Sequence, residues 1–201
     1  MTTQSRRGRR PGAPDTRAAI LAAARDRFAR VGFDATSIRA IAGDAGVDPA
    51  LVHHYFGSKR DLFVAALELP VDPREVLAPV VDAGLDGAGR RLLTMLLAVW
   101  DDEQRRLPLL AFARSALEPS GHHLFQDGFL PVIIRPVLAD LGVDEVDRRV
   151  PFVASQLAGL ILMRYVLRAE PLASMPSEEV VAVVGPTIQR YLDGPLPDVG
   201  P

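Results

Sequence analysis

The chain has 201 residues, 48% of them hydrophobic, which is enough for a substantial core and excludes a wholly disordered protein. It contains no cysteine, which excludes disulfides, thiolate zinc sites and cysteine nucleophiles and suits a reducing compartment such as the cytoplasm. Residues 1–60 carry 11 basic and 5 acidic side chains, net +6, whereas residues 61–201 carry 12 and 20, net −8. This division indicates that the first sixty residues meet a polyanion.

Residues 1–13 are expected to form a flexible basic arm, because they are rich in Arg, Gly and Pro and lack apolar periodicity. The arginines of the arm are Arg6, Arg7, Arg9 and Arg10. Guanidinium groups on such an arm can enter a narrow minor groove of DNA, and the Arg-Gly-Arg-Arg-Pro sequence resembles the core of an AT-hook. A passive solubilising tail is the alternative, since basic tails often bind nucleic acid without specificity.

A first helix is predicted over residues 15–31, with one apolar stripe and Gly32 at its end. The stripe consists of Ile20, Leu21, Ala24, Phe28 and Val31. The helix therefore has one face to pack against the helices that follow it.

Two short helices with a tight glycine turn between them are predicted over residues 37–56. Apolar residues of the first recur at i, i+3, i+4 and i+7, which directs one face toward a core. These residues are Ile38, Ile41, Ala42 and Ala45. Gly46 suits the left-handed position that ends a helix, Asp48 can cap the next helix, and Pro49 suits its first position. The pattern predicts a helix-turn-helix, which places its second helix in the major groove of DNA.

The second helix of this motif has an outward face that could read DNA. If Val52 and Phe56 point inward, a step of 100° per residue turns Ala50 and His54 outward, with Leu51 and His53 at the flanks of that face. A metal site at the two histidines is disfavoured, because neighbouring helical residues point about 100° apart and no carboxylate follows at i+4. The same reasoning applies to His122 and His123.

Residues 58–69 predict a fourth helix, opened by a capping box from Ser58 to Asp61 and stopped by Pro70. Lys59, the only lysine among 23 basic residues, lies in its first turn. Exposed N–H groups and the positive end of the helix dipole make that turn a favourable place for a DNA phosphate. An ordinary exposed lysine is the alternative.

The runs 36–39, 41–42, 45–47 and 54–59 resemble the N-terminal domain of the TetR family of bacterial transcriptional regulators. The similarity extends from about residue 15 to residue 69. The expected divisions are the arm, a DNA-binding domain over 14–74 with its helix-turn-helix at 37–56, an effector-binding and dimerisation domain over 75–194, and a frayed tail over 195–201. The resemblance implies an all-α fold with an N-terminal three-helix reader and a larger helical body.

The expected DNA contacts are Thr36, Ser37, Arg39, Asp48, Pro49, Ala50, Leu51, His53, His54, Tyr55 and Lys59. Arg39 can reach a guanine edge or a phosphate, although an exposed, solvated arginine is the alternative. Ala50 could contact a thymine methyl group. His53 stands where the family often has a Tyr that contacts phosphate, so a contact from His53 would depend on pH.

The rest of the chain predicts further helices over 73–82, 87–102, 108–117, 121–141, 144–169 and 177–193. No segment alternates with a period of two, so the body is expected to be all-α. Large apolar side chains in the middle could line a ligand cavity, as the family typically has one, or could fill a packed core. They are Met95, Leu96, Val99, Trp100, Phe112, Phe125 and Phe129. Gln126 or His123 could orient a ligand.

The last two long helices are the expected dimer surface, because residues 157–167 are apolar nearly all round and small residues precede them. The expected interface residues are Ala154, Ala158, Ile161, Tyr165, Val184 and Ile188. Gly185 and Pro186 should kink the last helix. The resemblance implies a four-helix interface across a twofold axis, and a wholly intrachain core is the alternative.

The sequence therefore predicts a homodimeric repressor that is released from a palindromic operator by a hydrophobic small-molecule effector. Its two reader helices, residues 49–55, would enter successive major grooves about 34 to 36 Å apart. A DNA-binding regulator that answers to a protein partner, or to nothing, is the alternative. We expect no enzyme activity, cofactor, metal or membrane partner, and a cytoplasmic location with association to the nucleoid when the protein is bound. The apolar run 157–167 contains Arg164 and is too short to span a bilayer.

Overall fold

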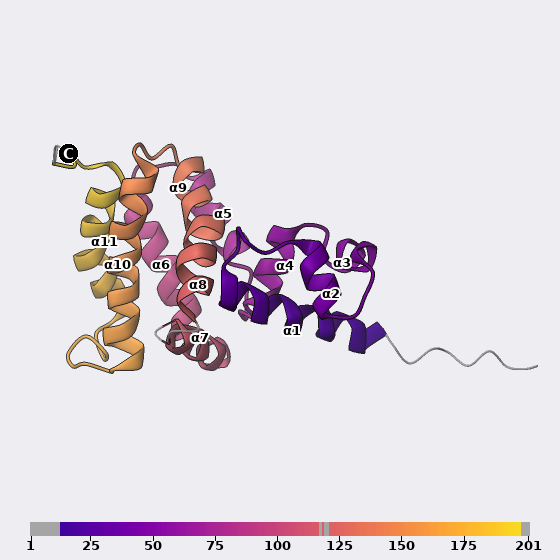
Figure 1. Cartoon of the computed structure of the whole chain (residues 1–201). Helices are drawn as coiled ribbons and strands as arrows, with labels where there is room; N and C mark the ends of the chain where they lie inside the picture. The colour runs from indigo at the N-terminus through magenta and orange to yellow at the C-terminus, as the bar shows by residue number, and fades with distance from the viewer. Residues whose placement is uncertain (1–12, 117, 119–120, 198–201) are drawn as a thin grey trace, which may run out of the picture.

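The computed structural model describes residues 13–197 apart from 117, 119 and 120, and this part of the chain contains helices and no strand. The first four helices form one end of the molecule (Figure 1): α1 (Ala13–Val31), α2 (Ile38–Asp44), α3 (Pro49–Phe56) and α4 (Lys59–Ala66). The body contains α5 (Pro73–Asp82), α6 (Ala88–Asp101), α7 (Glu103–Ser115), α8 (His122–Leu124), α9 (Arg135–Asp140), α10 (Val146–Ile161), α11 (Ser177–Asp193) and two π-helical segments, η2 (Phe125–Ile134) and η3 (Leu162–Val166). The all-α prediction is confirmed.

Several predicted helix limits are wrong. The helix expected over 144–169 begins at Val146 and ends, as η3, at Val166, because Arg168 has a positive φ of 53°. The fourth helix ends at Ala66 rather than at residue 69, because Glu68 has a positive φ of 50° that leaves the helical region before Pro70 is reached. The seventh begins at Glu103 rather than at Pro108. The Asp102 carboxylate caps it by accepting from the Gln104 N–H at 2.9 Å, so the proline lies inside the helix.

No helix within the described ranges is both long and apolar enough to cross a membrane.

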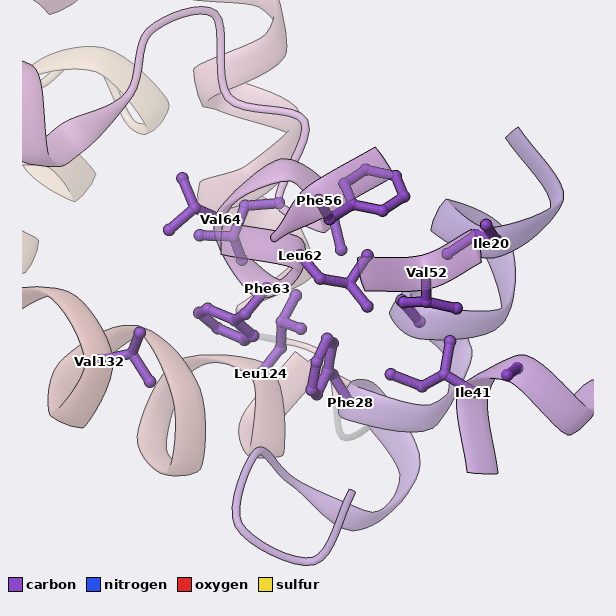
Figure 2. Packing of buried hydrophobic residues seen from close by; sticks show 14 of the residues in the cluster. Ile20, Phe28, Ile41, Val52, Phe56, Leu62, Phe63, Val64, Leu124 and Val132 are labelled. Carbon is purple, nitrogen blue, oxygen red and sulfur yellow. The ribbon is translucent and has the colours of Figure 1, made fainter. Parts of the chain in front are cut away.

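The core of the first four helices continues into the body. Phe28 and Phe63 are fully buried and meet edge to face with ring centroids 5.1 Å apart. Figure 2 shows Leu124 of α8 and Val132 of η2 beside this pair, and both belong to the same buried cluster. The core of the first four helices therefore extends into α8 and η2 of the body.

A glycine allows η2 to approach α4 this closely. A Cβ atom at Gly128 would lie 2.4 Å from Cζ of Phe63, far inside van der Waals contact. The ring of Phe63 therefore packs directly on the backbone of η2.

A second close approach joins α6 to α11. A Cβ atom at Gly89 would lie 2.5 Å from the Gln189 N and 2.6 Å from the Gly185 carbonyl oxygen, both backbone atoms. Gly185 therefore allows α11 to pack closely on α6, a role that the sequence analysis did not predict. The helix α11 continues through Pro186 as one helical segment. The Gln189 side chain adds a hydrogen bond, accepting from the Gly89 N–H at 2.8 Å.

We expect Gly89→Ala to destabilise the protein strongly, because the added methyl group meets backbone that cannot rotate away. Overpacking of this kind costs about 1–3 kcal/mol, which lowers Tm by about 2–12 °C in a chain of this length. Gly43→Ala is the matched control, since nothing lies within 4 Å of a Cβ atom there and a helical alanine is favoured over glycine. Thermal unfolding followed by circular dichroism measures both variants, and equal Tm values for Gly89→Ala and wild type would contradict the close packing.

Candidate nucleic-acid interface and ligand cavity

The helix-turn-helix is built by the Asp48 cap and the Gly46 turn that the sequence predicts, and by a second cap at Ser37 that the sequence analysis did not single out. The Ser37 hydroxyl accepts from the Ala40 N–H at 3.2 Å, and the Asp48 carboxylate accepts from the Ala50 N–H at 2.7 Å. Gly46 has a φ of +66° between the helices, a conformation that suits glycine. These local interactions fix where α2 ends and where α3 begins.

The predicted inner and outer faces of α3 are confirmed. Val52 and Phe56 are buried in the core, and Tyr55 is half-buried beside them. The exposed residues of α3 are Ala50, Leu51, His53 and His54. The outward face of α3 therefore carries aliphatic side chains in its first turn and two imidazole rings in its last turn.

His53 is held by its own helix. Its Nδ1 lies 2.9 Å from the Gly57 carbonyl oxygen, and because a carbonyl only accepts, Nδ1 must carry the proton. The neutral ring then has Nε2 as an acceptor, so His53 can donate to a phosphate from Nε2 only when the ring is protonated.

Thr36 corrects one expected DNA contact. Its side chain is 2% exposed, and its hydroxyl donates to the Gly32 carbonyl oxygen at 2.7 Å. Thr36 therefore closes the turn between α1 and α2 rather than facing DNA. Arg39, by contrast, is exposed and forms no ion pair with any described residue.

Lys59 is neither fully solvated nor paired with a carboxylate. Its Nζ lies 4.3 Å from the centroid of the Phe33 ring and donates to the Asp34 carbonyl oxygen at 3.4 Å. Burial lowers the pKa of Lys59, and the charge of Asp34 opposes that shift. The side chain of the first residue of α4 thus places its ammonium against the connection between α1 and α2.

The expected arm residues Arg6, Arg7, Arg9 and Arg10 lie outside the described residues. Residues 13–60 carry 7 basic and 5 acidic side chains, net +2, so four of the six positive charges of the N-terminal segment belong to the arm. Arg27 forms an ion pair with Asp44, with 2.7 Å between the Nε and Oδ2 atoms. The hydrogen bond that Arg27 donates lowers the pKa of Asp44. Most of the net positive charge that could attract a polyanion therefore precedes α1.

An ion-pair bridge joins the DNA-binding end to the body. Arg74, at the start of α5, contacts the Asp61 carboxylate at 2.7 Å and the Asp72 carboxylate at 2.8 Å. The pKa of Asp61 is lowered mainly by a hydrogen bond from Ser58 and next by the hydrogen bond from Arg74. The pKa of Asp72 is lowered mainly by its own hydrogen bond from Arg74. The first turn of α4 is thereby tied to the first turn of α5.

The body contains a partly open cavity of about 370 Å³. Six of the seven side chains expected there line it, namely Leu96, Val99, Trp100, Phe112, Phe125 and Phe129. Met95 is wrong as a lining residue, because it packs against the core between α6 and α11. Gln126 and His123 do not line the cavity either: both are exposed, and His123 Nδ1 lies 2.5 Å from the Asp127 carboxylate.

Several cavity residues escaped the sequence analysis. Leu69 and Val71 lie in the connection between α4 and α5, and Val76 lies on α5. The apolar run that surrounds Pro70 was the available signal. Ala154 and Ala158, which were expected at a dimer surface, also line the cavity, as does Ile161.

Ile188 is wrong as an interface residue, because it is 0% exposed in the core of its own chain. Tyr165 is largely engaged within the chain as well. Its ring stacks on Trp100 at 5.1 Å, and its hydroxyl donates to Asp101 at 2.8 Å. Burial, together with the bond to Asp101, raises the pKa of Tyr165. Val184 is half-buried.

Among the described residues, no group of three or more His, Cys, Asp or Glu side chains could hold a metal ion. The chemistry of the N-terminal end is instead that of a helix-turn-helix with an exposed second helix and cations beside it. Such a fold defines a DNA-binding transcriptional regulator.

Comparison with known families identifies the family of regulators to which the protein belongs. The family of bacterial regulatory proteins called the tetR family matches residues 20–66, and the tetracyclin repressor-like C-terminal domain matches residues 86–192, more than half of the chain. The protein belongs to the TetR family of bacterial transcriptional regulators, and nothing in these matches indicates an enzymatic family.

Individual relatives are also regulators. The HTH-type transcriptional repressor Rv3405c of Mycobacterium tuberculosis is 36% identical over 130 residues, which are 59% of this chain and 69% of the relative. An HTH-type transcriptional regulator of Mycobacterium bovis matches to the same extent. A solved TetR-family regulator from Streptomyces coelicolor is 43% identical, with 92% of this chain and 98% of that chain covered and a TM-score of 0.49.

Proposed function

We propose that this regulator is a homodimeric repressor that leaves its operator when an uncharged, apolar small molecule occupies the cavity. Residues 14–74 would bind DNA, with help from the arm over residues 1–13, and residues 75–194 would bind the effector and a second copy of the chain. The cavity is the single observation that carries the effector response.

The lining of the cavity supports an uncharged effector. None of the described side chains that line it carries a charge, and Trp100 supplies the single side-chain N–H among them. Its volume of about 370 Å³ falls in the range of small-molecule sites. A charged group buried there would lose its hydration without gaining a partner, so apolar molecules with few polar atoms fit the site best.

The outward surface of α3 supports operator binding in the major groove. Ala50 is small enough to allow a close approach to base edges, and the exposed Arg39 of α2 is long enough to reach a base edge or a phosphate. The caps at Ser37 and Asp48 occupy the loop ends that would face the phosphate backbone. In this proposal His54 and Tyr55 contact DNA from the last turn of α3.

The last two helices support a dimer. Phe152 of α10, Met163 of η3 and Val183 of α11 are 45%, 42% and 66% exposed, although each is a large apolar side chain. Figure 1 shows α10 and α11 at the end of the molecule opposite α3. Two such helix pairs related by a twofold axis would bury these side chains in a four-helix bundle and leave both reader helices exposed.

A matched pair of fluorescent probes tests the effector site. N-phenyl-1-naphthylamine is uncharged, and 8-anilinonaphthalene-1-sulfonate has the same aromatic groups with one added sulfonate. We expect the uncharged probe to bind, with enhanced fluorescence, and to raise Tm by about 5–10 °C at a concentration of one hundred times its Kd. The sulfonate should bind far more weakly, because its charge would be buried without a partner.

Operator release completes this test. Fluorescence anisotropy of a duplex selected from genomic fragments should fall as the uncharged probe saturates the protein. Equal binding of the two probes would contradict the uncharged lining. A protein that binds the probe but keeps its operator would favour the alternative, a regulator controlled by a protein partner or by nothing.

A further inference from the structure

The only lysine of the chain has two of its three N–H directions engaged. Its Nζ faces the Phe33 ring at 4.3 Å and the Asp34 carbonyl oxygen at 3.4 Å. An ammonium has three donors at tetrahedral angles, so one remains for an outside acceptor. The planar fork of an arginine would not reproduce this arrangement, although arginine supplies the other 22 basic residues.

The ring that holds the ammonium is itself fixed by the core. Phe33 stacks on Phe28 with centroids 5.7 Å apart and meets Phe63 edge to face at 5.3 Å. Phe28 and Phe63 are both fully buried and Phe33 is half-buried against them, so turning the Phe33 ring away would uncover two core residues. Both ends of the contact are therefore anchored, since Lys59 is also the first residue of α4 after the Ser58 cap.

We propose that Phe33 is a positioning residue for DNA binding, which presupposes that Lys59 contacts a DNA phosphate in the proposed operator complex, as its position in the sequence predicts. The face of the ring and the Asp34 carbonyl oxygen hold the ammonium beside the first turn of α4, with its third N–H directed to a backbone phosphate. Because the side chain is ordered before DNA arrives, phosphate binding loses little side-chain freedom. The gain is independent of sequence, since phosphates are common to all DNA.

A double-mutant cycle tests the coupling between the two residues. On both an operator duplex and a random duplex at low salt, we expect Phe33→Leu to weaken binding about three- to tenfold, the range of a partly desolvated cation–π contact. Phe33→Tyr keeps a ring and should keep the affinity. In the Lys59→Ala background, Phe33→Leu should have no further effect, because the ammonium that it positions is gone.

The double-mutant cycle tests the positioning role of Phe33 and the phosphate contact of Lys59 separately. If Phe33→Leu weakens binding equally in both backgrounds, its effect is merely structural and the positioning role is overturned, while the phosphate contact of Lys59 stands. If Lys59→Ala leaves affinity and salt dependence unchanged on both duplexes, the phosphate contact itself fails.

A spectroscopic readout reports the contact without DNA. Reductive methylation with ¹³C-formaldehyde labels Lys59 and the terminal amine, and a Lys59→Arg variant identifies the side-chain signal. Methyl protons held over the Phe33 ring should resonate upfield of free dimethyllysine in the wild type and in Phe33→Tyr, and should return to the free position in Phe33→Leu. A wild-type signal at the free position, with thermal unfolding showing intact protein, would overturn the proposal.

Discussion

Val183→Arg should convert the proposed dimer to monomers and weaken operator binding by at least about 100-fold, because one-site binding forfeits the effective concentration of the second reader. The Val183 side chain is 66% exposed on α11, so the single chain has room for arginine and its fold should not change. A twofold interface contains every substituted residue twice, and each arginine would bring a charge without a partner into an apolar contact. Sedimentation velocity and anisotropy on an operator duplex measure the two effects.

Leu107→Arg is the matched control for this variant. Leu107 is 75% exposed on α7, which is not one of the two helices proposed to form the interface, and the same substitution there should leave both oligomeric state and operator affinity unchanged. A Val183→Arg protein that sediments as a dimer would show that the contact between copies lies elsewhere.

Ala113→Trp should abolish the response to the uncharged probe. Ala113 lines the cavity from α7, and an indole group at this position would occupy much of the 370 Å³ available to a ligand. We expect no enhancement of N-phenyl-1-naphthylamine fluorescence and an operator affinity that no longer changes when the probe is added. A ligand can shift the equilibrium between DNA-binding and released forms only through a site that it can enter.

Ala111→Trp provides the comparison for this experiment. Ala111 lies two residues earlier on α7 and is exposed, so the same bulk is added outside the cavity. That variant should bind the probe as the wild type does. Undiminished probe binding by Ala113→Trp would place the effector outside the cavity.

The DNA-binding end could be predicted well because its signals are local. A cap such as Asp48 and a left-handed glycine such as Gly46 act within a few residues, and their effects are visible in the sequence. Thr36 shows the limit of such reasoning. Its hydroxyl donates to the Gly32 carbonyl oxygen four residues earlier, so a residue that the family resemblance suggested as a DNA contact is engaged in the turn that follows α1.

The body was harder to predict because its helices are apolar on more than one side. Along α10, Ala154 lines the cavity while Phe152 is exposed, and periodicity alone does not tell which face turns inward. On α11 the adjacent Val183 and Val184 are exposed and half-buried respectively, and Ile188 belongs to the core. The apolar sequence around them does not distinguish these three environments. The difference between a cavity and a filled core depends on packing distances, which no sequence pattern specifies.

The π-helical segment η2 has two contacts with different consequences. Phe125 and Phe129 form a wall of the cavity, and Gly128 on the same segment rests against the Phe63 ring of α4. Only one helix diameter, roughly 10 Å, therefore separates a molecule in the cavity from the core beneath the reader helices. A ligand that displaced η2 would act directly on the Phe63 ring in the core of the DNA-binding domain. Coupling between the two sites therefore requires no long chain of intermediate residues.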